Sequence, residues 1–289
     1  MNWPGNCGWA MISGKRIKKS HVGVELVRLL AGEGDRIFTT DRARELSSQV
    51  GLEDSYLVEA LHHLRRNGWI VPIRRGLYAI SSSVPGVSPA HEFEIAMALV
   101  SPAAISHWSA LHHHGLTDQI PRRVFVSTTA SSVPRVRGAR TGGPSGVGYP
   151  VGPTVYRFVQ LKPERFFGMQ KVWQGEARVV VTDPERTLLD GLSKPQLCGD
   201  FAEVLGAFRA RGADLDVERI VNYVLKLDAV IAKRLGWVLE DLRFQGAHLD
   251  LLEQVPVKGY GRLDPTGARQ GPCNRRWLVR ENLPGKVTS

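Results

Sequence analysis

Residues 54–80 constrain the fold of this chain more than any other stretch. Three leucines recur at i, i+4 and i+7, the spacing of one helical face: Leu57, Leu61 and Leu64. Asn67–Gly68 suits the end of that helix, because glycine readily adopts the left-handed conformation found just past a helix C-terminus. Two apolar runs follow, Trp69 to Ile73 and Leu77 to Ile80, with three residues between them. So short a connection leaves room for nothing but a hairpin.

The tip of the predicted hairpin is basic, because Arg74 and Arg75 stand there before Gly76. A helix, a hairpin and a basic tip in this order are typical of the recognition helix and wing of a winged helix-turn-helix. The arginines are placed to meet phosphate or to enter a minor groove, which points to duplex DNA as the ligand. A small helical unit with a hairpin has the same pattern without binding DNA, and the basic tip is what favours the DNA-binding interpretation.

The sequence also predicts the two upstream helices that this motif needs. Four apolar residues at helical spacing indicate the first helix: Val22, Leu26, Leu29 and Leu30. Residues 38–41 have the composition of a capped helix start. The buried face of this second helix is expected to consist of Ala43, Leu46 and Val50. Gly51 is the expected turn before the third helix, where Asp54 and Ser55 are expected to supply capping oxygens.

If the leucines of the third helix face the core, its polar residues face solvent. The first two turns of such a helix reach base edges in the major groove. The predicted DNA-binding residues lie on this helix, at the start of the second helix and at the hairpin tip: Thr40, Arg42, Ser55, Tyr56, Glu59, His62, His63, Arg66, Arg74 and Arg75. Glu59 repels phosphate, so its expected role is to accept a hydrogen bond from a cytosine amino group.

Charge is consistent with an anionic partner. The 289-residue chain has 38 Lys+Arg against 28 Asp+Glu, a net charge of +10, which favours neutralisation of phosphates. The charge is uneven. Residues 121–171 contain nine bases and one acid, whereas acids outnumber bases fourteen to ten in residues 172–254. The length suits one large domain or two ordinary ones.

The expected compartment is the cytoplasm. Cys7, Cys198 and Cys273 are few and lack paired spacing, which indicates a reducing environment. No apolar run reaches transmembrane length, and the N-terminus lacks the apolar core of a secretory signal, so no membrane partner is expected. Residues 1–19 are expected to form a mobile basic tail, with Met11 as an alternative start.

We expect an α+β chain with two domains. The tail at 1–19 precedes a winged helix-turn-helix at 20–80, a Ser/Pro/Gly-rich linker at 81–89 and a larger, helix-rich α+β domain at 90–289 with a long basic loop at 128–152. In the larger domain we predict helices at 91–99 and 105–114, strands at 124–126, 155–161 and 177–182, a helix opening at 182–185, and a helical pattern from 201 to 253 with stops at Gly212 and Gly246.

Several short motifs, in order, resemble the AbiEi family of antitoxins, the DNA-binding members of abortive-infection toxin–antitoxin pairs. Within residues 21–282 they are RRGLYAI (74–80), ISHWSALHHHGLTDQIP (105–121), VTDPERTLLDGL (181–192), AKRLGWVLE (232–240), LDP (263–265) and NRRW (274–277). The resemblance implies an N-terminal winged helix that binds inverted repeats in the chain's own promoter, and a C-terminal domain that carries antitoxin activity. It also implies a nucleotidyltransferase-like toxin as the functional partner, neutralised without a stable complex.

Neighbouring histidines at 62–63 and 112–114, together with His107, invite a metal-site interpretation. Adjacent positions on a helix point in different directions, so these imidazoles cannot converge on one ion. Neither an HExxH motif nor a pair of CxxC motifs occurs. We therefore expect no metal site and no cofactor, and one or two of the histidines at 107–114 are expected to be satisfied structural residues.

The segment DPERTLLD invites a catalytic interpretation, with Asp183 and Asp190 as an acid pair. Helical spacing favours a structural motif instead, because Asp183 suits the helix cap and Arg186 stands four residues before Asp190, as in an ion pair. Three leucines are expected to pack inward: Leu188, Leu189 and Leu192. Cys198 has no histidine near it in sequence, and the glycine-rich stretch 141–148 lacks the Gly-Lys-Ser/Thr end of a phosphate loop. No catalytic residue is predicted.

The winged-helix pattern points to a DNA-binding protein, and the AbiEi resemblance implies a transcriptional repressor that acts as an antitoxin; we expect such a protein and not an enzyme. Two alternatives stay open: a stand-alone winged-helix regulator, and a nucleic-acid-processing enzyme whose basic second domain carries the chemistry. A clustered, partly buried set of acids near the basic middle of the chain would favour the enzyme.

Overall fold

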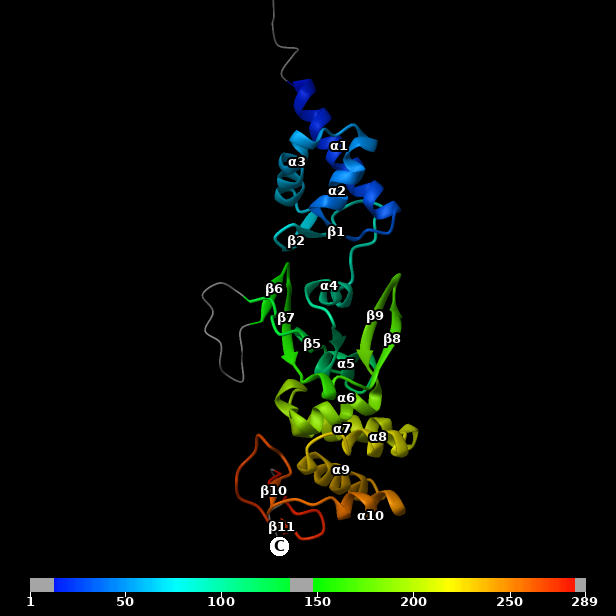
Figure 1. Cartoon of the computed structure of the whole chain (residues 1–289), viewed down its shortest axis with the longest axis vertical. Helices are drawn as coiled ribbons and strands as arrows, with labels where there is room; N and C mark the ends of the chain where they lie inside the picture. Colours follow the sequence, from blue (N-terminus) through cyan, green and yellow to red (C-terminus); the bar gives the residue numbers. More distant parts are fainter. Residues whose placement is uncertain (1–12, 136–147, 284–289) are drawn as a thin grey trace, which may run out of the picture. The chain divides into compact units, whose positions relative to one another are not determined.

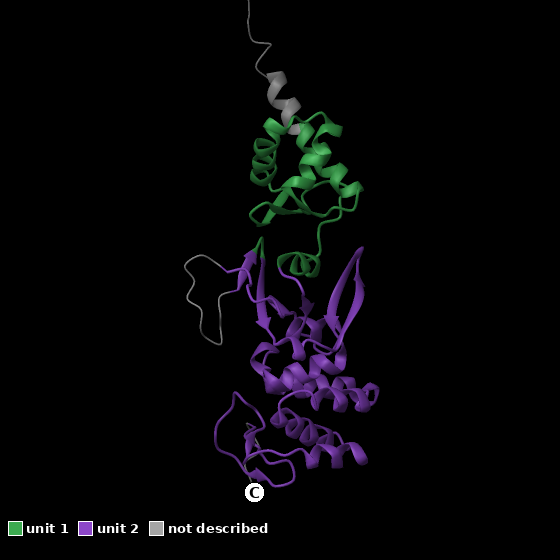
Figure 2. Ribbon diagram, viewed as in Figure 1, with its two compact units in different colours: residues 1–99, 151–153 green, residues 100–150, 154–289 purple. Residues whose placement is uncertain are grey.

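Helices and sheets both build this chain, which confirms the α+β fold class (Figure 1). The computed structural model describes residues 13–135 and 148–283, with side chains described from residue 21 onward. The chain divides into two compact units (Figure 2). Unit 1 comprises Met1–Leu99 and Val151–Pro153, and unit 2 comprises Val100–Pro150 and Thr154–Ser289. Among the described residues, no helix combines the length and the apolar character needed to cross a membrane.

Unit 1 combines helices with a small antiparallel sheet. Its helices are α1 (Ser13–Gly32), α2 (Thr40–Ser47), α3 (Asp54–Arg66) and α4 (Glu92–Leu99), and its strands are β1 (Ile37–Thr39), β2 (Ile70–Arg74) and β3 (Leu77–Ile80). The strand order is β1-β3-β2, and both pairings are antiparallel. α3 leads directly into β2 and packs against it, so the helix and the β2–β3 hairpin are adjacent both in the chain and in the fold (Figure 1).

Capping and glycine geometry determine where these elements end. The Thr39 side chain accepts a hydrogen bond from the Arg42 backbone N–H at 3.1 Å and so caps α2. A short 3-10 helix, Ser48–Val50, follows, and Gly51 then turns the chain with a φ of 71°. Gly68 follows α3 with a φ of 72°, the left-handed conformation that its sequence position predicts.

The core of unit 1 is built from the apolar faces that the leucine spacing predicts. Leu57 is 0% exposed, and Leu61 and Leu64 are each 4% exposed. They cluster with buried residues of α1, α2, the sheet and the segment after it: Leu26, Val27, Leu30, Phe38, Ala43, Leu46, Leu52, Ile70, Ile80 and Val84. α3 therefore turns one face inward and leaves the opposite face to solvent.

The predicted cap of α3 is wrong. Glu53 occupies the N-cap position without a side-chain hydrogen bond, and Asp54 and Ser55 already lie within the helix. The Asp54 carboxylate instead accepts a hydrogen bond from Arg44 Nε of α2 at 2.7 Å. The acid that was expected to cap the helix therefore links α3 to α2.

The boundaries of unit 1 also differ in detail from those expected. α1 begins at Ser13, within the residues expected to form a tail, and β1 was missed because three residues are too few for a strand pattern. β2 begins one residue later than predicted. In the segment expected as a linker, Val84 is 1% exposed and belongs to the unit 1 core. α4, expected in the second domain, clusters with unit 1.

Unit 2 is built on a mixed sheet. Its strands are β4 (Ala104–Ile105), β5 (Arg123–Thr128), β6 (Tyr149–Val151), β7 (Thr154–Gln160), β8 (Met169–Gln174) and β9 (Ala177–Thr182), in the order β6-β7-β5-β4-β9-β8. β5 pairs in parallel with β7 and antiparallel with β4. β9 pairs in parallel with β4 and antiparallel with β8. The short strand β4 thus joins two halves of the sheet, which diverge in Figure 1.

The helices of unit 2 form its largest core. They are α5 (His107–His113), α6 (Pro184–Ser193), α7 (Phe201–Arg211), α8 (Val217–Val224), α9 (Ala229–Asp241) and α10 (Ala247–Gln254). α5 packs against β5 of the sheet. α6 contacts α5, α7, α8 and α9, and each of its residues from 185 to 192 is buried. The central position of α6 therefore carries charged side chains into the core.

The C-terminal part of unit 2 packs onto α9 through a small sheet. Its strands are β10 (Gly261–Arg262), β11 (Cys273–Asn274) and β12 (Val279–Arg280), in the order β10-β12-β11. Trp277 is 0% exposed, and its indole N–H donates to Glu240 Oε2 at 2.6 Å. A Cβ at Gly236 would lie 2.1 Å from the Trp277 ring, so this close approach requires glycine.

The sequence predicted most elements of unit 2. β9 and the start of α6 lie where predicted, and β5 and β7 lie within a few residues of their predicted positions. The helix expected at 105–114 begins only at His107, because Ala104–Ile105 forms β4. β8 was missed because it is an edge strand without clean alternation of buried and exposed residues. Of the basic loop predicted at 128–152, residues 136–147 lie outside the described residues.

Candidate nucleic-acid interface

The solvent face of α3 carries the polar residues that the sequence singled out. All of its predicted contact residues are exposed: Ser55, Tyr56, Glu59, His62, His63 and Arg66. Tyr56 is 42% exposed although it is aromatic. The buried leucine stripe determines the rotation of α3 about its axis, so this polar face cannot turn inward without disrupting the core.

The tip of the β2–β3 hairpin presents two exposed arginines on a tight turn. Arg74 and Arg75 are exposed, and Gly76 adopts a φ of 73°, a conformation that a side chain would strain. The Thr40 backbone N–H donates to the Gly76 carbonyl oxygen at 2.9 Å. The start of α2 therefore holds the hairpin tip in place, and Thr40 is half-buried beside it.

Ion pairing divides the arginines of unit 1 into two groups. From residue 21 onward, four have acidic partners: Arg28, Arg36, Arg42 and Arg44. The side chains of the others form no hydrogen bond or ion pair with any described residue: Arg65, Arg66, Arg74 and Arg75. This second group lies at the C-terminal end of α3 and at the hairpin tip. Within residues 21–99, positive charge without a described counter-charge is therefore concentrated at these two places.

Arg42, a predicted DNA contact, is engaged within unit 1. Its Nε lies 2.6 Å from Asp35 Oδ2, and its Nη1 lies 3.0 Å from Glu45 Oε2. These hydrogen bonds raise the pKa of the Arg42 guanidinium, with Asp35 the largest cause. A phosphate would have to compete with two carboxylates for this side chain.

Glu59 and His63 lie one turn apart on the solvent face of α3. Glu59 Oε1 is 3.6 Å from His63 Nε2, and both side chains are more than half exposed. A contact of this length between exposed groups contributes little stability. It therefore does little to hold either side chain away from a ligand.

Two further exposed residues of α3 escaped the sequence analysis. Arg65 is exposed beside Arg66, and Val58 is 69% exposed beside Tyr56. Helical spacing signalled both, because each lies off the buried leucine stripe. An exposed valine on a helix that enters a DNA groove can contact thymine methyl groups.

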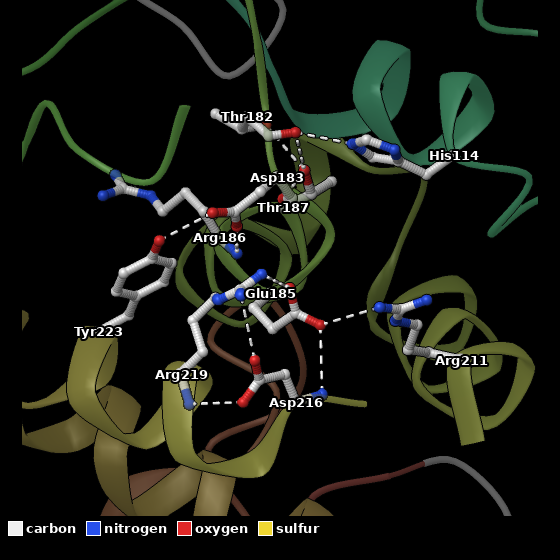
Figure 3. A network of polar contacts seen from close by, with 10 residues as sticks. All are labelled: His114, Thr182, Asp183, Glu185, Arg186, Thr187, Arg211, Asp216, Arg219 and Tyr223. Carbon is white, nitrogen blue, oxygen red and sulfur yellow. Dashed lines mark hydrogen bonds and ion pairs between the residues drawn. The ribbon is translucent and has the colours of Figure 1, made fainter. Parts of the chain in front are cut away.

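Unit 2 buries the charged segment DPERTLLD (Figure 3). Asp183 caps α6, since its Oδ1 accepts from the Arg186 backbone N–H at 2.8 Å and its Oδ2 accepts from the Tyr223 hydroxyl at 2.8 Å. Arg186 is 2% exposed, and its Nε donates to Asp190 Oδ1 at 2.9 Å. The guanidinium also lies 4.5 Å from the centre of the Phe167 ring. The segment thus forms the cap and the ion pair that its spacing suggests.

Glu185 is fully buried in the same network. Its Oε1 accepts from Arg211 Nη2 at 3.2 Å and from the Asp216 backbone N–H at 3.3 Å, and Arg219 Nη1 lies 3.6 Å from its Oε2 (Figure 3). A carboxylate removed from water needs partners of this kind. Glu185 and its two arginines were not predicted, because they lie on three different helices, α6, α7 and α8, and meet only in the folded chain.

Burial also sets the protonation of this network. It raises the pKa of the Asp183 carboxyl, while the hydrogen bonds from the Arg186 backbone and Tyr223 oppose the shift. Burial and the bond to Asp183 raise the pKa of Tyr223 to about 12. Tyr223 is therefore a hydrogen-bond donor at neutral pH, and its role is to hold Asp183 in place.

Two of the histidines at 107–114 make structural hydrogen bonds. His114 Nε2 lies 2.7 Å from the Thr182 carbonyl oxygen (Figure 3). His107 is 2% exposed, and its Nδ1 lies 2.8 Å from Ser106 Oγ. Burial lowers the pKa of His107 to about 4, so this imidazole is neutral at pH 7. Its φ of 52° lies in the left-handed region that non-glycine residues rarely adopt.

A cluster of buried acids, the feature that would favour an enzyme, is present, but its members are bound internally. Asp183, Glu185 and Asp190 are engaged by the tyrosine and arginines described above. Two oxygens, Asp190 Oδ2 and Glu185 Oε2, are buried without a hydrogen-bond partner among the described residues, and Arg219 Nη1 lies 3.6 Å from Glu185 Oε2. In the part of the chain that the structure describes, no three His, Cys, Asp or Glu side chains are placed to hold a metal ion. Burial raises the pKa of the Cys198 thiol well above its usual value, which disfavours the nucleophilic thiolate.

Comparison with known proteins agrees with the motif resemblance. Residues 25–81, from within α1 to just past β3, match the family model described as transcriptional regulator, AbiEi antitoxin. The chain is also similar to the crystal structure of the RV2827C protein from Mycobacterium tuberculosis, with a TM-score of 0.65 over 90% of each chain and 16% sequence identity. At this identity the likeness concerns the fold alone. No match was found among curated proteins.

Proposed function

We propose that this chain is a DNA-binding transcriptional repressor that acts as the antitoxin of a toxin–antitoxin pair and is not an enzyme. In this proposal unit 1 is a winged helix-turn-helix, with α3 as the recognition helix and the β2–β3 hairpin as the wing. The observation that carries the proposal is the distribution of arginines in residues 21–99, where those without a described acidic partner lie at the end of α3 and at the wing tip. The family match of residues 25–81 supports the same conclusion.

The charges on α3 favour different roles for its two ends. Its start is acidic, with Glu53 and Asp54, and Arg44 partly neutralises this end through Asp54. Its end is basic, with Arg65 and Arg66. Phosphate contacts therefore fall to the end of α3 and to the wing, where they position the protein on the duplex. The exposed residues of the first two turns are left to read base edges in the major groove.

The AbiEi resemblance supports the finer part of the proposal. The DNA target is a set of inverted repeats in the chain's own promoter, so two copies bind with their recognition helices related by the symmetry of the repeat. The functional partner is a nucleotidyltransferase-like toxin, which unit 2 counters in the cytoplasm without a stable complex. The internal pairing of the buried acids in unit 2 favours this interpretation over the enzyme alternative.

Two measurements on the full-length chain test the proposal. Fluorescence anisotropy should show tighter binding to DNA from upstream of its own reading frame than to random duplex of equal length. Co-expression with the product of the neighbouring gene should relieve the toxicity of that product. Equal affinity for both duplexes would contradict sequence-specific regulation. Specific DNA binding without relief of toxicity would support the stand-alone regulator instead.

A further inference from the structure

One face of the unit 2 sheet carries arginines that no described acidic residue neutralises. Arg123 and Phe125 are two residues apart on β5, so they point to the same face. Arg157 on the parallel strand β7 pairs in register with Phe125, so it lies on that face as well. Both arginines are partly exposed, and neither side chain forms a hydrogen bond or ion pair with any residue that the structure describes.

A third cation, Lys194, directly precedes a short element that packs against this face. Leu197 packs in a small cluster with Phe125 and Val159, and the short 3-10 helix that carries it begins directly after Lys194. The Lys194 side chain has no acidic partner among the described residues. Trp108, in the same cluster, has a buried indole N–H without an acceptor. This face of the sheet thus collects hydrogen-bond donors and positive charge without matching acceptors.

Two arginines on one sheet face without described acidic partners are electrostatically unfavourable. Burial lowers the pKa of the Arg157 guanidinium, and the nearby charge of Arg123 lowers it further. The other arginines that unit 2 places around α6 differ, because Arg186 and Arg211 each face a carboxylate. The negative charge that would offset the repulsion between Arg123 and Arg157 is missing from the described residues, so a bound anion is the natural source.

We propose that Arg123 and Arg157 bind a phosphate group of a ligand, with the phosphodiester backbone of nucleic acid as the favoured source. Guanidinium groups offer paired N–H donors that match phosphate oxygens. Such contacts position a backbone without reading its bases. The site lies in unit 2 and goes beyond the proposed function, because it gives unit 2 its own affinity for phosphate.

The test compares three full-length double variants, of which the site variant and the control each lose two positive charges. The site variant is Arg123→Gln/Arg157→Gln, and Arg123→Lys/Arg157→Lys is its charge-retaining counterpart. The matched control is Arg269→Gln/Arg275→Gln, which removes two exposed arginines of unit 2 that have no partner among the described residues. One arm measures how affinity for a labelled random duplex falls with salt, and the other measures binding of inorganic phosphate by calorimetry.

For a backbone ligand, the site variant should lower the salt slope for the duplex by about 0.9 per lost contact, while the lysine variant and the control keep most of it. A loss of inorganic phosphate binding without a change in the duplex slope would support the phosphate site and identify a small phosphate compound as its source. Because all variants keep unit 1 intact, these differences do not depend on promoter binding. Site and control variants that behave alike in both arms would overturn the proposal.

Thermal stability supplies an independent readout. If Arg123 and Arg157 serve a ligand, removing their mutual repulsion should leave the melting temperature in low salt unchanged or raise it. If they serve the fold, the site variant should melt well below the Arg269→Gln/Arg275→Gln control. That second result would also overturn the proposal.

Discussion

The charged residues around α3 and those around α6 resemble each other in sequence and differ completely in structure. Both segments start with acids and carry arginines within the next turns or at the end. Around α3 the arginines at 65, 66, 74 and 75 are exposed and without partners among the described residues. Around α6, Arg186 is 2% exposed and bound to Asp190. The first arrangement leaves charge available to a ligand, whereas the second uses charge to hold helices together.

Whether an arginine has an acidic partner, more than the residue type itself, distinguishes a binding surface from a structural motif in this chain. Arg42 shows this within unit 1, because it was predicted to contact DNA but is bound to Asp35 and Glu45. Arg123 and Arg157 show the converse in unit 2, where two arginines on one sheet face lack any described acidic partner.

Sequence patterns predicted the structure most reliably where the spacing of a few nearby residues determines burial or capping. The leucine stripe predicted the buried face of α3, and Asp183 was correctly expected to cap α6. Patterns failed where the partner lies far along the chain. No local signal shows that Asp54 binds Arg44, or that Arg211 and Arg219 surround Glu185. The position of Arg157 on the same sheet face as Arg123 could not be predicted either, because it depends on the register between β5 and β7.

The largest expected effect is a loss of folding stability when the buried ion pair of α6 is broken. Arg186→Met leaves the buried Asp190 carboxylate without its partner, and breaking a buried pair in this way costs about 3–5 kcal/mol. Urea unfolding followed by circular dichroism measures the loss. The matched variant Arg186→Met/Asp190→Leu removes both charges and should recover much of the stability. A single variant as stable as the unsubstituted chain would show that Asp190 has no need of this partner.

The next largest expected effect is a loss of folding stability as the pH falls. Burial lowers the pKa of His107 from 6.5 to about 4, so the unfolded chain takes up this proton first as the pH falls. The stabilising contribution is complete above pH 6.5 and is lost progressively down to about pH 4, a difference of about 3 kcal/mol. Unfolding at pH 7 and pH 4.5 should show a smaller acid-induced loss for His107→Gln than for the exposed control His112→Gln. Equal losses in both variants would exclude His107 as the cause.

A smaller effect is expected in base recognition on the solvent face of α3. Glu59→Ala should reduce the preference for the specific site over random duplex by about 1–3 kcal/mol, the usual contribution of one good base contact. Binding to random duplex should persist, because a carboxylate does not contact phosphate. Competition anisotropy with both duplexes measures the ratio. An unchanged ratio would mean that Glu59 remains in solvent when DNA is bound.

The smallest effect on DNA binding is expected for Arg42→Ala. Because Asp35 and Glu45 already occupy this guanidinium, the substitution should lower the melting temperature slightly and leave the salt dependence of DNA binding as it was. A variant of normal stability with a reduced salt slope would show that phosphate displaces the carboxylates, and it would move Arg42 into the group of arginines that contact DNA.

The central claim, that the unpaired arginines of unit 1 contact phosphate, is tested most directly by the salt slope of DNA binding. Arg74→Ala/Arg75→Ala should lower the slope of log affinity against log salt by up to about two, roughly 0.9 for each lost contact. The control Arg28→Ala/Arg209→Ala removes the same charge from two exposed arginines that are paired with Glu25 and Asp241, and it should leave the slope nearly unchanged. Equal slopes for the two double variants would contradict the account.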